Sequence, residues 1–161
     1  MGKARRIDHW KNPDAPKPTT RRPSASVLVR DMTGRVLLLR RPDNGLWTIP
    51  TGGLKKGETA TECGVRECHE ETGVEIEITG LVGVFTTPDH VIEYVRKGKT
   101  EVRQPVNICL HARPVGGEPT TTDEASEVRW VTPADLDSYD IHPALRRRID
   151  HGLSLGRPHV D

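Results

Sequence analysis

Short runs of apolar and β-branched residues, separated by polar turns, recur along most of the chain. Runs of about four to eight such residues are typical of strands. The residues Asp31–Gly34 predict a hairpin turn, and the charged run Arg96–Gln104 predicts an exposed turn. Gly80 and Gly83 predict a bend or bulge within one strand. The segments that predict strands are Ser24–Arg30, Arg35–Arg40, Leu46–Ile49, Glu75–Thr86, His90–Val95, Pro105–Arg113 and Glu127–Val131.

Helical signals are concentrated in the middle and at the end of the chain. Thr59 and Glu62 form a capping-box pattern and Gly73 is a typical helix stop, so a helix is expected over Ala60–Thr72. Strands on both sides of this helix, with helices at the end, predict a mixed α/β or α+β domain. The two later helices are expected at Pro133–Leu136 and Pro143–Leu153.

The first part of the chain differs from the rest because prolines stand there among Lys and Arg residues. We therefore expect residues 1–22 to form an extended N-terminal arm, with His9 and Trp10 as anchors on the domain. A chain of 161 residues is typical of one domain. Residues 23–161 are expected to form that single domain, ending in the C-terminal helix.

The composition is polar, with 34% hydrophobic and 29% charged residues and a formal net charge of +1. A charge this close to zero gives no overall field that would attract nucleic acid. No apolar stretch approaches the roughly 20 residues that span a bilayer, and the N-terminus lacks the apolar core of a signal peptide. Cys63, Cys68 and Cys109 form no Cys-x-x-Cys pair and are interpreted as buried thiols. We expect a cytoplasmic protein without nucleic-acid or membrane partners.

Three carboxylates gather on one face of the central helix. At about 100° per residue, Glu70 lies about 60° to one side of Glu67 and Glu71 about 40° to the other. Like charges this close repel one another, and a bound divalent cation would remove the repulsion. Oxygen ligands without a His or Cys partner favour Mg²⁺, with Mn²⁺ as a substitute, over Zn²⁺. The same pattern alone is also typical of a solvated helix face.

The flanks of the helix favour a ligand site. Gly52 and Gly53 let the backbone approach a ligand, and Arg66 can orient a carboxylate or meet a phosphate. The segment Gly52–Val74 resembles the Nudix box, the loop–helix–loop signature of the Nudix hydrolase family, with Cys68 in an aliphatic position as its mildest departure. The resemblance implies a mixed β-sheet sandwiched between helices, an α/β/α sandwich. It also implies hydrolysis of a nucleoside diphosphate linked to another moiety.

The resemblance further implies roles for individual residues. Arg66 would hold Glu67 in place, and Glu67 would take a proton from the attacking water. In some relatives an acidic residue of a loop outside the box takes this proton instead. Glu124 and Glu127 are the candidates here, and we place Glu127 with Glu67 and Arg66 among the catalytic residues. The implied metal ligands are Glu67, Glu70, Glu71 and, as a further one, Glu58. The residues that would shape the substrate loop are Gly52 and Gly53.

The substrate is less well defined by the sequence. Trp47 and Trp130 could stack on a nucleobase, although tryptophans in apolar strands are more often core residues. Pro88 stands about where several ADP-ribose-cleaving relatives carry a proline, and a proline at a strand end also needs no function. The side chains that could contact phosphates, or equally lie on the surface, are Arg40, Arg41 and Arg103.

Three functions therefore stay open. We favour an Mg²⁺-dependent pyrophosphohydrolase of ADP-ribose or a nucleotide sugar. The alternatives are a (d)NTP pyrophosphohydrolase that cleans the nucleotide pool and a non-catalytic Nudix module that senses a nucleotide. Such modules often lack a box glutamate, whereas this chain has all of them. A small-molecule nucleotide is the expected partner, and the resemblance suggests a homodimer.

Overall fold

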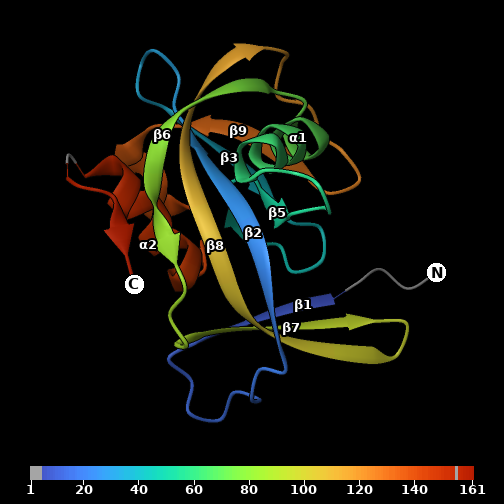
Figure 1. The fold of residues 1–161 in the computed structure, drawn as a ribbon. Helices are drawn as coiled ribbons and strands as arrows, with labels where there is room; N and C mark the ends of the chain where they lie inside the picture. The colour runs from blue at the N-terminus through green and yellow to red at the C-terminus, as the bar shows by residue number, and fades with distance from the viewer. Residues whose placement is uncertain (1–4, 155) are drawn as a thin grey trace.

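The structure is a computed structural model that describes residues 5–154 and 156–161 (Figure 1). Its strands form one large mixed sheet and one small antiparallel sheet. In the large sheet, β6 pairs with β8 and β10 pairs with β6, outside the main order. The strands of the large sheet are β1 (Arg5–Trp10), β7 (His90–Arg96), β8 (Lys99–Gly116), β2 (Thr20–Val29) and β5 (Thr51–Gly53) in spatial order, with β6 (Glu75–Phe85) and β10 (His159–Val160).

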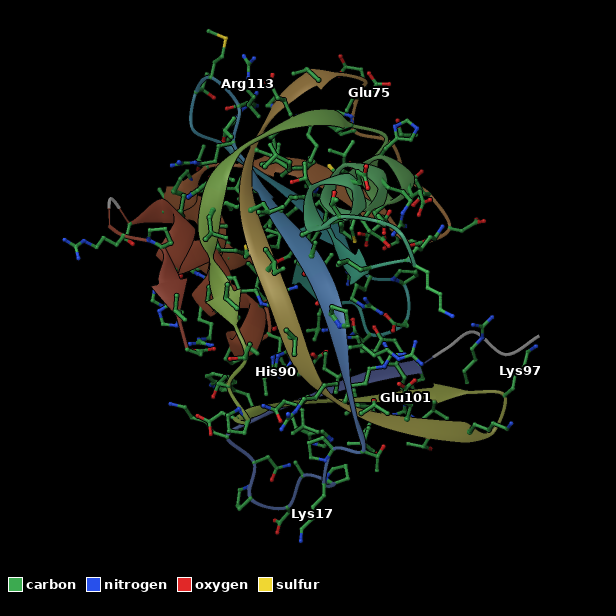
Figure 2. All side chains as sticks on the ribbon, viewed as in Figure 1. Lys17, Glu75, His90, Lys97, Glu101 and Arg113 are labelled. Carbon is green, nitrogen blue, oxygen red and sulfur yellow. The ribbon has the colours of Figure 1, made fainter. Side chains whose placement is uncertain are left out.

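Strand β8 organises the large sheet because it pairs along both of its edges. On one edge it pairs antiparallel first with β7 and then with β6, and on the other it pairs in parallel with β2. The turn expected over Arg96–Gln104 is much shorter than predicted. Strands β7 and β8 continue up to it on both sides, so only Lys97 and Gly98 form the turn. Figure 2 shows Lys97 at the tip of this hairpin. Register shifts near Gly80 and Gly83 confirm the irregularity predicted for β6.

The small sheet adjoins the large sheet next to strand β2. The turn expected at Asp31–Gly34 is present, with the Gly34 N–H donating to the Asp31 carbonyl at 3.0 Å. It does not close a regular hairpin, since the strand before it joins the large sheet and the strand after it joins the small one. Only Arg30 and Val36 bridge the two. The strands of the small sheet are β4 (Trp47–Thr48), β3 (Val36–Arg40) and β9 (Glu127–Val131).

Helices cover both faces of the large sheet (Figure 1). They are α1 (Ala60–Thr72), the 3-10 helix η1 (Pro133–Ser138) and α2 (Pro143–Leu153). Neighbouring residues of a strand point to opposite faces. Accordingly Val27 of β2 packs beneath Gly64 of α1, and Leu28 packs beneath Gly152 of α2. The predicted α/β/α sandwich is confirmed, and both α-helices begin and end where the sequence predicts. Among the described residues, no helix is long and apolar enough to cross a membrane.

The beginning of the described chain belongs to the sheet. Strand β1 pairs antiparallel with β7 along its whole length, from Arg5 opposite Val95 to Trp10 opposite His90. The boundary expected at residue 23 falls inside β2, and residues 1–4 of the predicted arm lie outside the described residues. The Pro-rich residues 11–19 form the loop that joins β1 to β2.

A buried ionic network fastens β1 to β7. Arg6 donates to both carboxylate oxygens of Asp8 at 2.9 and 2.8 Å, and Nε2 of His90 lies 2.8 Å from the same carboxylate. Burial opposes ionisation of Asp8, but the charge of Arg6 and the hydrogen bonds from His90 and Arg6 hold its pKa below the ordinary 3.8. Burial lowers the pKa of His90 to about 4, so its ring is neutral near pH 7 and donates a hydrogen bond to Asp8. Figure 2 shows His90 at the base of the hairpin, beside β1.

We predict that Asp8→Ala destabilises the protein by roughly 3–5 kcal/mol at pH 7, because it leaves the buried Arg6 guanidinium without its counter-ion. Urea unfolding measures the change, and Asp14→Ala, at an exposed loop position, is the control. Because the pKa of Asp8 is depressed in the folded state, its contribution is complete well above pH 3.8 and is lost as the pH falls below that value. A difference between the two variants that stays constant down to pH 2 would contradict this account.

Candidate active site

Local interactions fix the ends of α1 and thereby the direction of its acidic face. The Glu62 N–H donates to the Thr59 hydroxyl at 3.1 Å, and the Thr59 N–H donates to the Glu62 carboxylate at 2.8 Å. Gly73 ends the helix in the left-handed conformation, with a φ of 75°. These caps orient the helix so that Glu67 and Glu71 face the β5 strand, where Thr51 and Gly52 lie.

The guanidinium of Arg66 lies among three carboxylates. It donates to Glu58 at 2.6 and 3.0 Å, to Glu67 at 2.8 Å and to Glu70 at 3.1 Å. A further hydrogen bond to the Gly53 carbonyl, at 3.2 Å, ties this group to the β5 loop. The hydrogen bonds from Arg66 and from the Lys55 backbone lower the pKa of Glu58 to about 2. The structure thus brings together Glu58, Arg66, Glu67 and Glu70, four of the site residues proposed from the sequence.

Glu71 lies deeper than the other acids. Its side chain is buried, with 4% of the residue exposed, and it accepts a hydrogen bond from the Thr51 N–H at 2.9 Å. Burial raises the pKa of Glu71 well above its ordinary value, and the charges of Glu67 and Glu124 raise it further. Burial likewise raises the pKa of Glu67, against the opposing effect of Arg66. More negative charge therefore gathers here than one guanidinium can neutralise.

The donor set fits a hard divalent cation. The carboxylates of Glu67, Glu70 and Glu71 supply only oxygen atoms, the ligands that Mg²⁺ and Mn²⁺ prefer. Within residues 5–154 and 156–161, no three His, Cys, Asp or Glu side chains enclose a metal position as they stand. Arg66 bonds to one carboxylate oxygen of Glu67 and to one of Glu70. The second oxygen atom of each of these two carboxylates accepts no hydrogen bond from Arg66.

The two loop acids considered from the sequence occupy different surroundings. Glu124 lies close enough to Glu67 and Glu71 to raise the pKa of both carboxyls. Glu127, on β9, accepts hydrogen bonds from Arg40 at 3.0 Å and from Arg129 at 2.6 Å. The structure therefore brings Glu124 to the acidic cluster, whereas it ties Glu127 to two arginines.

A cleft of about 470 Å³ begins at the β5 end of this cluster. Thr51, Gly52 and Gly53 line one part of it, and none of its described lining residues is Asp or Glu. Tyr94 supplies an aromatic wall, with the Arg103 guanidinium 4.1 Å above its ring. A cavity of similar size, about 490 Å³, contains none of the residues of the acidic cluster. The cationic residues that line the cleft are Arg6, Arg22, Arg41, Lys56, Arg103 and Arg148.

Several predicted substrate contacts lie outside this cleft. Trp47 is buried and meets Tyr139 edge-on with ring centroids 4.9 Å apart, and Trp130 packs against the apolar cluster beneath α1. Pro88 is exposed in the turn between β6 and β7. Arg41 does line the cleft, although its guanidinium also bonds to Asp43 at 3.0 and 2.9 Å.

Arg6, Tyr94 and Arg148 are among the cleft residues that sequence reasoning missed. Arg6 and Tyr94 meet only because β1 pairs with β7, in which these two residues lie opposite each other. Arg148 stands in a run of three arginines on α2, and the apolar pattern of that helix marks its inner face. That pattern could have shown that Arg148 is next to Ile149 on the inner face of the helix. It could not have shown that the cleft reaches Arg148.

Comparison with known proteins agrees with this geometry. The NUDIX domain family matches residues 20–151, and the chain belongs to that family of hydrolases. A MutT-like protein from Streptomyces ambofaciens is 34% identical over 84% of this chain and 79% of its own length. Members of the family act on small nucleotides and generally need a divalent metal.

Two further relatives are named for different substrates. A putative 8-oxo-dGTP diphosphatase from Bacillus subtilis is 28% identical over 78% of this chain and 76% of its own. An ADP-ribose pyrophosphatase from Methanocaldococcus jannaschii is 32% identical over 73% of this chain and 61% of its own. The fold matches the crystal structure of a NUDIX hydrolase from Nitrosomonas europaea, with a TM-score of 0.69 and 22% identity over 86% of this chain and 76% of that one.

We predict that Gly52→Ala abolishes most of the hydrolase activity, because the added Cβ would overlap the carboxyl group of Glu67 and displace it. The matched control is Gly53→Ala, whose Cβ would have the Pro23 carbonyl as its nearest neighbour at 4.0 Å. Steady-state kinetics should show a loss in kcat for the first variant and a much smaller change for the second. Equal losses in both variants would show that loop flexibility, and not the position of Glu67, is what matters.

Proposed function

We propose that this chain is an Mg²⁺-dependent pyrophosphohydrolase, with Mn²⁺ as a substitute, in which Glu67, Glu70 and Glu71 hold the metal. Glu58 would be a further ligand, direct or through water. The observation that supports this is the gathering of Glu58, Glu67 and Glu70 around the guanidinium of Arg66, beside a cleft lined with cationic side chains. Negative charge on one side suits a cation, and positive charge on the other suits a phosphate.

When bound, a divalent ion neutralises phosphate charge and lowers the pKa of a water molecule. The chain's own residues would do the rest. Glu67, held on one side by Arg66, takes a proton from the attacking water, and Glu124 is the loop acid placed to assist it. The cationic cleft would hold the phosphate groups, and Tyr94, the aromatic residue that lines it, would contact the nucleoside.

Our first candidate substrate is ADP-ribose or a nucleotide sugar, which yields a nucleoside monophosphate and a sugar phosphate. It is supported by the M. jannaschii relative and by the size of the cleft, which falls in the range of roughly 300–1,000 Å³ usual for small-molecule sites. A dimer in the cytoplasm that does not act on nucleic acid completes this proposal.

A second candidate is a (d)NTP pyrophosphohydrolase, which yields a nucleoside monophosphate and pyrophosphate. It is supported by the excess of cations in the cleft, because a triphosphate carries more negative charge than a sugar-linked diphosphate. The B. subtilis relative named for 8-oxo-dGTP also supports it. The third alternative, a non-catalytic sensor, is disfavoured because every box glutamate is present.

A substrate panel separates these candidates. ADP-ribose, nucleotide sugars, dinucleoside polyphosphates, (d)NTPs including 8-oxo-dGTP, and a 5′-triphosphorylated RNA are incubated with Mg²⁺ or Mn²⁺, and the products are separated by chromatography. AMP and ribose phosphate from ADP-ribose support the first candidate, and pyrophosphate from a triphosphate supports the second. Cleavage of the RNA would contradict the proposed restriction to small nucleotides. No metal-dependent turnover of any compound would overturn the proposal.

We predict that Glu67→Gln lowers kcat by about 100- to 10,000-fold, the usual cost of losing a group that moves a proton. The thermal midpoint should not fall, because the change removes one of several carboxylates that repel one another. Replacing the exposed His69 of the same helix by Ala is the control and should leave kcat near wild type. Full activity of the Glu67→Gln enzyme would remove this residue from the site.

The loop acids give a second comparison. We expect Glu124→Gln to lower kcat more strongly than Glu127→Gln, because the charge of Glu124 acts on Glu67 and Glu71 whereas Glu127 is bonded to Arg40 and Arg129. Single-turnover rates at saturating metal measure the effect on the chemical step. The opposite order would restore Glu127 to the catalytic role predicted from the sequence.

A further inference from the structure

Arg148 of α2 is a buried guanidinium without a counter-ion. The residue is 3% exposed, and its Nε has no hydrogen-bond partner in the part of the chain that the structure describes. Burial lowers the pKa of Arg148 to about 10, which still leaves the group charged at neutral pH. Buried charges are normally paired, because an unpaired one loses its hydration without compensation.

The groups around Arg148 do not supply the missing negative charge. Asp8, the carboxylate nearest to it in electrostatic effect, is already bonded to Arg6 and His90. The Arg6 charge cancels that of Asp8, and the His90 ring is neutral. Arg147, the next residue of the helix, carries another positive charge, which is paired with Asp161 at 2.7 Å. One buried positive charge is therefore left over at the inner wall of the cleft.

Arg148 shares this wall with a second guanidinium that has a free donor. Arg103 donates through Nη2 to Glu101 at 2.8 Å and stacks on Tyr94, but its buried Nε has no partner among the described residues. Both arginines line the same cleft, together with Arg6. A guanidinium presents its N–H groups in a planar fork that matches the oxygen atoms of a phosphate.

We propose that Arg148, Arg103 and Arg6 form a phosphate-binding subsite in the cleft, separate from the carboxylates of α1. It would hold a phosphate group that is not attacked and would thereby select substrates that carry one. The natural ligand of this subsite rests on the proposed function, because the subsite lies in the cleft that is proposed to bind the nucleotide substrate. The three arginines come from α2, β8 and β1, so a phosphate bound there would link the first strand of the described chain to its last α-helix.

Calorimetric titration with inorganic pyrophosphate in EDTA tests the subsite. Without a divalent ion the α1 carboxylates repel pyrophosphate, so binding reports on the cationic side chains of the cleft, and the variants show which of them bind it. We expect wild type to bind pyrophosphate, Arg148→Gln to bind it at least about tenfold more weakly, and Arg148→Lys to retain part of the affinity. The matched control is Arg146→Gln on the same helix, whose side chain pairs with Asp137 and Asp150 outside the cleft and whose loss should not change the affinity.

Thermal unfolding separates a binding role from a structural one. Because the buried charge of Arg148 is unpaired, Arg148→Met should raise Tm in the absence of ligand and should lose most of the pyrophosphate-dependent rise in Tm. A wild-type protein that does not bind pyrophosphate, or an Arg148→Gln variant that binds as tightly as wild type, would overturn the subsite. Neither measurement requires metal or turnover. If no compound of the substrate panel were cleaved, the proposed function would be contradicted, but the phosphate-binding subsite would still be tested by these two measurements.

Discussion

Four carboxylates and one guanidinium meet where the β5 loop crosses helix α1, and their charges do not balance. Arg66 satisfies Glu58 and shares its remaining donors between Glu67 and Glu70, while Glu71 is buried with a backbone N–H as its partner. Burial and mutual repulsion raise the pKa of both Glu67 and Glu71. A divalent cation bound by these carboxylates, as we propose, would relieve both penalties.

The rest of the fold places this excess of negative charge next to a cleft lined with positively charged side chains. The caps of α1 aim the acids at β5, and Gly52 leaves just enough room for the Glu67 carboxyl group. From β5 the cleft runs along a wall built by β1, β7, β8 and α2, and the charged residues of that wall are all basic. A pyrophosphate between the two would meet a cation on one side and arginines on the other, which is the arrangement that phosphoryl chemistry requires.

What the sequence could predict was local. Helix α1 was predicted to the residue because its signals, the Thr59–Glu62 box and Gly73, lie within the helix itself, and the same periodicity placed Glu67, Glu70 and Glu71 on one face. Elements defined by distant partners were misread. Residues 99–103 look like a charged turn until β7 pairs with them, and residues 5–10 look like an arm until they pair with β7, which follows 80 to 90 positions later in the chain. Arg6 and Tyr94 come together through the pairing of β1 with β7 and Arg148 reaches the cleft from α2, so no local motif revealed them. Trp47 and Trp130 could be either core or ligand contacts by composition; in the structure Trp47 is buried against Tyr139, and Trp130 is partly buried against the apolar cluster beneath α1.

The central claim, that the α1 carboxylates form a divalent-cation site, is tested most directly by titrating the protein with Mn²⁺ and measuring free ion by electron paramagnetic resonance. Our account predicts saturable binding in the wild-type protein, competition by Mg²⁺, and a large loss of affinity in Glu71→Gln. Binding that is absent in wild type, or that is unchanged when the buried carboxylate of Glu71 is replaced, would contradict it.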